Sequence, residues 1–202
     1  MRKENKKVAE FFDVLTEKHG FSFRSLAYGS VETQLKKFKA LIEVGLDKEE
    51  RKVTVFDVGC GFGDLAEFMK RKGIDFKYIG IDISSKVVAV ANNKRPDWDI
   101  SIGDILEMED NNLFDYVLAT GFNCVKTRYN WEVLIQAITK MFNLSKKAVA
   151  FGAVSTYREN KNTATYYTSP ERLFSYCMKN LTRHVTLRHD YLPHDFTIYL
   201  YK

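Results

Sequence analysis

The sequence contains few cysteines, and this excludes two kinds of small-protein architecture. Its three cysteines, Cys60, Cys124 and Cys177, are widely spaced among 202 residues and form no CxxC pair. Disulfide frameworks and structural zinc sites both need cysteines in pairs or clusters at short spacings. We therefore expect neither a disulfide-stapled fold nor a bound metal ion.

Long apolar runs are also absent. A membrane-spanning helix needs about 20 consecutive apolar residues, and no segment approaches that length. Residues 1–7 are rich in lysine and lack the hydrophobic region of a signal peptide. These absences predict a cytoplasmic protein without a membrane partner.

Charge of one sign does not dominate, because the sequence has 31 Lys and Arg residues and 26 Asp and Glu residues, which gives a net charge of +5. The lysine-rich segments 2–7 and 36–39 lie near acidic residues, which is typical of a solvated surface. With 45% hydrophobic residues, the chain is long enough for one well-buried domain, which we expect to span residues 1–202.

Strand and helix patterns alternate through the middle of the sequence, as in α/β folds with a parallel sheet. Ser84 and Ser169 are expected N-caps, and Pro170 is expected in the first turn of its helix. We predict strands at 54–58, 78–83, 99–102, 114–121 and 148–154, and helices at 1–20, 31–46, 64–71, 84–92, 131–142 and 170–179.

The C-terminal part differs, because two strand-like segments, 184–192 and 196–201, follow each other directly. Their connection, Pro193-His194-Asp195, is too short to carry a crossover helix. The two strands must therefore pair antiparallel as a hairpin.

A glycine-rich turn follows the first strand and is the most informative segment. Alternate glycines at 59, 61 and 63 let the backbone bend sharply and let a ligand approach it closely. A loop that binds a dinucleotide pyrophosphate would carry a third glycine at position 64. Asp64 stands there instead, which argues against an NAD-dependent oxidoreductase.

The order acidic-x-Gly-x-Gly-x-Gly, from Asp57 to Gly63, resembles motif I of the class I S-adenosylmethionine (SAM)-dependent methyltransferases. Asp82 ends the second strand 21 residues after Gly61, Gly103-Asp104-Ile105 follows the third strand, and residues 114–121 resemble motif IV. The resemblance implies a Rossmann-like three-layer α/β sandwich. Its mostly parallel sheet has seven strands in the order 3-2-1-4-5-7-6 and closes with the C-terminal antiparallel hairpin. Residues 1–50 would form a helical cover and 51–202 the SAM-binding core.

The resemblance also implies a cofactor site for SAM, with S-adenosylhomocysteine (SAH) as the product. Asp57 would stabilise the turn near the methionine ammonium, while Asp82 would hold the ribose and Asp104 the adenine. The full set of expected cofactor-binding residues is Tyr28, Asp57, Gly59, Cys60, Gly61, Asp82, Ile83, Asp104, Ile105 and Thr120.

The acceptor side is expected beyond the carboxyl ends of the strands, where ligands of open α/β sheets bind. Candidate catalytic residues there are Asn123, Tyr157, His194 and Asp195. His194 and Asp195 could form a general base with an orienting acid, or they could be polar turn residues.

The segment Thr120-Gly121-Phe122-Asn123 has no proline, unlike the Asn/Asp-Pro-Pro-Tyr/Phe segment of DNA amino-methyltransferases. Cys124 follows Asn123, whereas cytosine-C5 enzymes place a nucleophilic cysteine after a proline. Both departures argue against the enzymes that methylate nucleic-acid bases. Because the sequence is close to a minimal core with a short N-terminal cover, we expect a methyltransferase with a small-molecule acceptor. An RNA or protein methyltransferase and a non-catalytic SAM-binding module stay open as alternatives, as do the acceptor atom and the oligomeric state.

Overall fold

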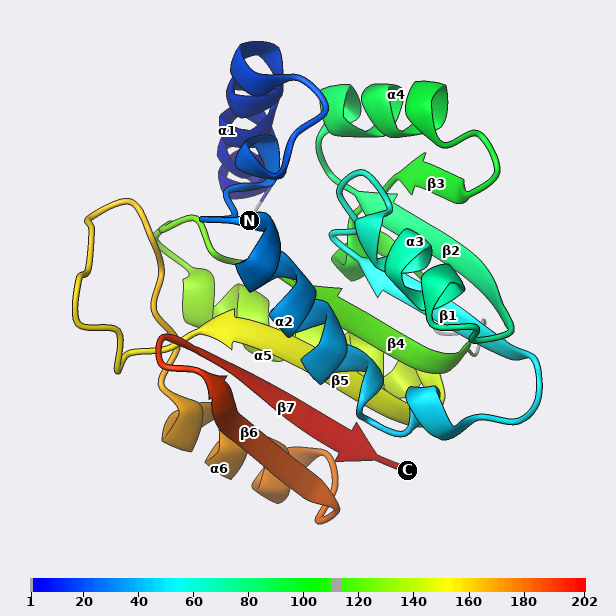
Figure 1. Ribbon diagram of the computed structural model, residues 1–202. Helices are drawn as coiled ribbons and strands as arrows, with labels where there is room; N and C mark the ends of the chain where they lie inside the picture. The colour runs from blue at the N-terminus through cyan, green and yellow to red at the C-terminus, as the bar shows by residue number, and fades with distance from the viewer. Residues whose placement is uncertain (1, 110–113) are drawn as a thin grey trace.

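The structure is a computed structural model that describes residues 2–109 and 114–202, with side chains from residue 4 onward. Its strands form one seven-stranded sheet in the order β3-β2-β1-β4-β5-β7-β6, which confirms the expected topology (Figure 1). The strands are β1 (Val53–Val58), β2 (Phe76–Asp82), β3 (Asp99–Ile102), β4 (Phe114–Thr120), β5 (Ser145–Val154), β6 (Val185–Leu192) and β7 (Asp195–Tyr201).

Helices cover both faces of the sheet and make three layers. The described α-helices are α1 (Arg2–His19), α2 (Val31–Ile42), α3 (Asp64–Arg71), α4 (Ser85–Lys94), α5 (Asn130–Leu144) and α6 (Pro170–Asn180). Side chains of α2, α3 and α4 join the core on one face, and those of α5 and α6 join the core on the other. Among the described residues, no helix is long and apolar enough to cross a bilayer.

Local signals explain where several helices begin and end. The hydroxyl groups of Ser84 and Ser169 each accept a backbone N–H bond at 3.1 Å, which confirms both predicted N-caps. The helix predicted over residues 31–46 ends at Ile42 instead. Gly45 has a φ of +117°, which is incompatible with a continuing helix, and a short 3₁₀ turn (η2, Leu46–Lys48) follows it.

The C-terminal hairpin is confirmed, since β6 and β7 pair antiparallel with only Pro193 and His194 between them. β7 also pairs antiparallel with β5, so the last strand in the sequence lies between β5 and β6 (Figure 1). This arrangement places Asp195, the first residue of β7, opposite Val154, the last residue of β5.

Gly80 on β2 is a position where the packing admits no side chain. A Cβ added there would lie 2.8 Å from the Sγ atom and 2.9 Å from the Cβ atom of Cys60. We expect Gly80→Ala to lower the free energy of unfolding by about 1–3 kcal/mol, as overpacked cores do. Urea denaturation measures the change.

Gly29→Ala is the matched control, because a Cβ at Gly29 meets nothing within 4 Å. Its free energy of unfolding should stay within about 0.5 kcal/mol of the parent value. Equal losses in the two variants would show that the contact with Cys60 is not the cause.

Candidate functional site

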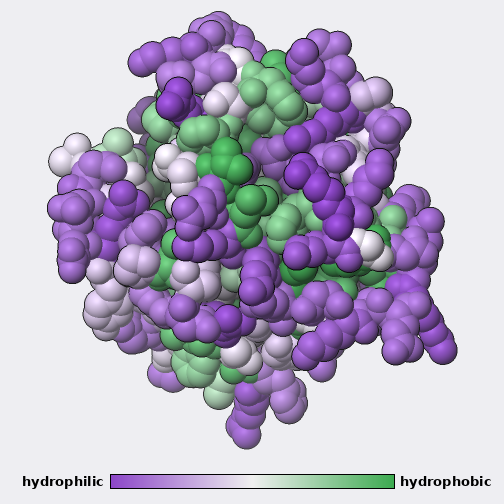
Figure 2. Space-filling view, in the orientation of Figure 1, coloured by the Kyte–Doolittle hydropathy of each residue, from purple (hydrophilic) through white to green (hydrophobic). Residues whose placement is uncertain are grey.

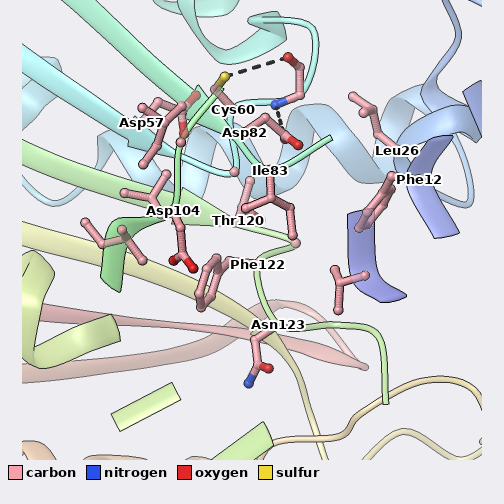
Figure 3. Close-up of a pocket in the computed structure, with 18 of the residues that line it drawn as sticks. Phe12, Leu26, Asp57, Cys60, Asp82, Ile83, Asp104, Thr120, Phe122 and Asn123 are labelled. Carbon is pink, nitrogen blue, oxygen red and sulfur yellow. Dashed lines mark hydrogen bonds between the residues drawn. The ribbon is translucent and has the colours of Figure 1, made fainter. Parts of the chain in front are cut away.

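A cavity with about 1090 Å³ of open space lies at the carboxyl ends of β1, β2 and β4. All ten residues expected to bind a cofactor line this cavity, and so does Asn123. Figure 3 shows three carboxylates, those of Asp57, Asp82 and Asp104, on the sheet side, with Phe12 of α1 and Leu26 across from them. The fold therefore brings residues from positions 28 to 123 into one site.

The glycine-rich turn forms the cavity wall after β1. Gly59 and Gly61 have φ angles of +71° and +58°, in the left-handed region that favours glycine. The N–H groups of Gly59 and Cys60 both donate to the carbonyl of Ile81, at 2.8 and 3.0 Å, and bend the turn back toward β2. A Cβ on Gly61 would lie 2.7 Å from the Leu26 side chain, so only glycine fits at this position without a shift of Leu26.

Asp82 connects the glycine-rich turn to the start of α4. Its two carboxylate oxygens accept N–H bonds from Gly61 at 3.0 Å and from Ser84 at 2.9 Å. Ser84 in turn donates its hydroxyl to Asp13 of α1 at 2.5 Å. Burial raises the pKa of Asp82, while these backbone N–H bonds oppose the rise. Asp82 therefore lies on the cavity wall in a fixed orientation.

Asp57 is almost fully buried at the end of β1 and accepts a hydrogen bond from the hydroxyl of Tyr78 at 2.7 Å. Burial raises its pKa to about 7; the bond from Tyr78 opposes the rise, and the nearby Asp82 and Asp64 add to it. The Asp57 carboxyl group therefore changes between its neutral and its ionised form near neutral pH.

Asp104 caps the short 3₁₀ helix η3 (Ile105–Glu107) and accepts the N–H of Leu106 at 2.9 Å. Its second oxygen accepts a bond from the side-chain amide of Asn5 on α1. Helix α1 therefore contacts the cavity lining directly through Asn5, and through Asp13 it contacts Ser84, whose N–H binds Asp82.

The charge of the cavity is one-sided. Five of its described lining residues are acidic, namely Glu4, Asp57, Asp64, Asp82 and Asp104, and none is Lys, Arg or His. Such a lining favours a ligand with positive groups and disfavours one with phosphates.

At the end of β4, the hydroxyl of Tyr28 lies beside Gly121, 3.9 Å from the position that a Cβ on this glycine would take. Burial, with Asp57 nearby, raises the pKa of Tyr28 far above its ordinary value, so its hydroxyl keeps its proton. The ammonium of Lys37 lies 5.5 Å from the centre of the Tyr28 ring and pairs with Asp195 at 2.7 Å.

Comparison with known proteins agrees with this geometry. Residues 55–147 match the family model described as a methyltransferase domain. A protein of Mycobacterium tuberculosis that is named a methyltransferase is 28% identical, over 74% of this chain and 93% of its own length. The chain therefore has the fold of the class I methyltransferases, and residues 55–147 match a methyltransferase domain.

Two further proteins extend the likeness. The demethylmenaquinone methyltransferase of Thermotoga maritima is 30% identical over 59% of this methyltransferase, and the match spans 51% of the Thermotoga protein. The crystal structure of magnesium protoporphyrin IX methyltransferase from Synechocystis, with bound SAH, superposes with a TM-score of 0.72 at 12% identity. It covers 96% of this chain and 97% of its own, which shows a shared fold.

The four candidate catalytic residues of the methyltransferase separate into two groups. Asn123 lines the cavity, but its amide exchanges two hydrogen bonds with Asn130, at 2.7 and 2.9 Å. Tyr157, His194 and Asp195 do not line it. Their catalytic roles stay predictions that the geometry does not favour.

The surroundings of those three residues give them other contacts. Tyr157 is 63% exposed and donates its hydroxyl to Glu171. Asp195 pairs with Lys37, and His194 lies 3.3 Å from the other Asp195 oxygen. Burial lowers the pKa of His194, and Asp195 opposes this shift.

The resemblance implied a helical cover over residues 1–50 but named no side chain of α1, and the structure adds four of them to the cavity wall, namely Glu4, Asn5, Val8 and Phe12. Val8 and Phe12 belong to the apolar stripe of α1, which indicated burial but not what it would face. No three His, Cys, Asp or Glu side chains in the described chain gather as a metal site would require. The expectation of a metal-free site stays a prediction.

Proposed function

We propose that this methyltransferase transfers a methyl group from SAM to a small-molecule acceptor. The observation that carries the proposal is the cavity lining, which has five acidic residues and, in its described part, no basic one. SAM has a positive ammonium and a positive sulfonium but no phosphate, whereas NAD brings a doubly charged pyrophosphate. The acidic lining therefore fits SAM and not NAD.

The fit extends to individual groups. In this proposal, Asp57 faces the methionine ammonium, Asp82 holds the ribose hydroxyls and Asp104 takes the adenine amine. The left-handed Gly59 and Gly61 leave their backbone open to the cofactor, because no Cβ stands in the way.

When bound, SAM supplies an activated methyl group, so the chain mainly has to position the reactants and exclude water. Precise positioning can contribute up to roughly 7–11 kcal/mol in well-oriented systems. The protonated hydroxyl of Tyr28, which lies beside Gly121 in the cavity lining, can donate a hydrogen bond at the end of β4, where the acceptor is expected. Val8, Phe12 and Phe122 give the rest of the cavity an apolar wall that keeps out water.

An apolar wall with few polar groups suits a small acceptor. The names of two similar proteins agree, since they act on demethylmenaquinone and magnesium protoporphyrin IX. RNA and protein acceptors stay as alternatives to be screened in the same assay.

The test has two steps. Calorimetric titration should show SAH binding and no response to NADH. Incubation with methyl-labelled SAM and a panel of small metabolites, RNA and protein should then label a small molecule. Binding of NADH in preference to SAH would contradict the assigned cofactor, and labelling of only RNA or protein would contradict the acceptor class.

Binding of SAH should depend on pH through Asp57. Its pKa of about 7 leaves the carboxyl mostly protonated at pH 6 and mostly ionised at pH 8. Because the ionised form attracts the ammonium of SAH, affinity should rise about tenfold from pH 6 to pH 8. Calorimetry at both pH values measures this.

Asp57→Asn is the matched variant, because asparagine keeps the shape but cannot ionise. Its SAH affinity should vary much less between pH 6 and pH 8. A pH dependence equal to that of the parent protein would show that another group titrates.

A further inference from the structure

A second hollow lies on the outer side of α2, between α2, α3 and the segment that contains the 3₁₀ helix η1 (Phe23–Leu26). It has room for water-sized molecules over about 350 Å³, which is near the lower end of the range for small-molecule sites. We call it the phenylalanine groove, and its apolar lining is Phe21, Phe23, Val31, Leu35, Phe38, Phe62 and Phe68.

The groove leaves large apolar side chains in contact with water. Phe21, Val31 and Leu35 are 43%, 51% and 40% exposed, while Phe38 and Phe62 below them are buried. In Figure 2, hydrophobic side chains gather near the centre of this face and hydrophilic ones surround them. An apolar hollow with a polar rim is typical of a binding site.

Cations surround the apolar surface. Three of the phenylalanine rings each have a cation over the ring: Arg95 lies 5.0 Å from Phe21, Arg24 lies 5.5 Å from Phe23, and Lys72 lies 5.7 Å from Phe68. Arg71 also lines the groove, and its exposed guanidinium has no ion-pair partner in the part of the chain that the structure describes.

The acidic groups nearby are already engaged. Asp64, the acidic residue of the lining, pairs with Arg95 at 2.6 Å and accepts the amide of Gln34 at 2.9 Å. Glu32, beside Val31, pairs with Lys36 at 2.8 Å. The rim therefore keeps an excess of positive charge that complements an anion.

The groove is separate from the cofactor cavity. Gln34, Phe38 and Asp64 line both hollows, and the hydrogen bond from Gln34 to Asp64 lies in the partition between them. The two hollows differ in charge, because the cavity lining is acidic while the rim of the groove is basic. They therefore suit different ligands.

We propose that the phenylalanine groove binds a small amphipathic carboxylate, with an apolar body against the phenylalanine rings and its carboxylate on Arg71. A guanidinium can bind a carboxylate through two parallel hydrogen bonds. The concave shape, with Phe62 as its floor, suits one inserted molecule better than a flat membrane. The proposal does not depend on the proposed methyl transfer.

The experiment titrates the full chain with 6-phenylhexanoate by calorimetry and compares 6-phenylhexan-1-ol, which has the same body without the charge. The acid should bind more tightly than the alcohol. Arg71→Gln should weaken the acid about tenfold and leave the alcohol unchanged, because only the acid uses the guanidinium. Leu35→Asn should weaken both probes.

Lys70→Gln is the matched control, since Lys70 is a cation on the same helix that lies over Trp98, outside the groove lining. It should leave acid binding unchanged. SAH affinity should be the same in all three variants. A failure of the groove proposal can therefore be distinguished from a failure of the proposed SAM site.

Four results would overturn the proposal: equal affinities for acid and alcohol, equal losses in Arg71→Gln and Lys70→Gln, competition between the acid and SAH, or no binding. If the protein does not bind the acid but sediments with phosphatidylglycerol vesicles, and Leu35→Asn abolishes this sedimentation, the groove is a membrane contact instead. If the protein does not bind the acid but forms a dimer, and Leu35→Asn dissociates this dimer, the occupant of the groove is a second copy of the chain.

Discussion

Replacing Lys37 by methionine should lower the free energy of unfolding by about 3–5 kcal/mol, which is the cost of leaving one partner of a buried ion pair without its counter-ion. Lys37 on α2 pairs with Asp195 on β7 at 2.7 Å, and the two side chains are only 13% and 3% exposed. Methionine keeps the apolar stem but leaves the Asp195 carboxylate in a site with little water. Urea denaturation measures the loss.

Two controls isolate the ion pair. Lys36→Met changes the neighbouring lysine, whose partner Glu32 is largely exposed, and should cost less than about 0.5 kcal/mol. Adding Asp195→Asn to Lys37→Met removes the unpaired charge and should restore a large part of the loss. Equal effects of Lys36→Met and Lys37→Met would show that burial does not strengthen this pair.

Replacing Asp82 by alanine should weaken SAH binding by about 1–3 kcal/mol, or roughly 5- to 150-fold, through lost charge-assisted hydrogen bonds. The proposed ribose contact disappears with the carboxylate. The N–H groups of Gly61 and Ser84 also lose their acceptor, so the glycine-rich turn is held less firmly. Calorimetry with SAH measures the affinity.

Asp99→Ala is the matched control, because Asp99 is an exposed aspartate at the start of β3, outside the cavity lining. It should leave SAH affinity unchanged. A folded Asp82→Ala variant with full SAH affinity would show that the ribose assignment is wrong, although it would leave the class I methyltransferase fold of the chain unquestioned.

The local signals of the sequence predicted much of the fold. Ser84 and Ser169 cap their helices as expected, because N-capping needs only a few neighbouring residues. The short link at Pro193 required a hairpin for a geometric reason. The strand order was not predicted from local signals. It came from the resemblance, and periodicity alone could not have supplied it.

Contacts between distant segments could not be predicted in this way. Lys37 and Asp195 are 158 positions apart, and Asn5 reaches Asp104 from a helix that a hydrophobic pattern only marks as amphipathic. A lysine in a helix usually faces water, so nothing local distinguished Lys37 from Lys36. The cavity side of α1 and the groove beside α2 depend on how helices pack, which the sequence pattern leaves open.

The position of β7 between β5 and β6 has a consequence for synthesis on the ribosome. Until residues 195–201 have emerged, β5 has a neighbour on one edge only, and its other edge offers unpaired backbone groups. Lys37 also lacks its counter-ion until Asp195 arrives. A nascent chain in which β7 has not yet docked therefore exposes an unpaired, aggregation-prone edge of β5.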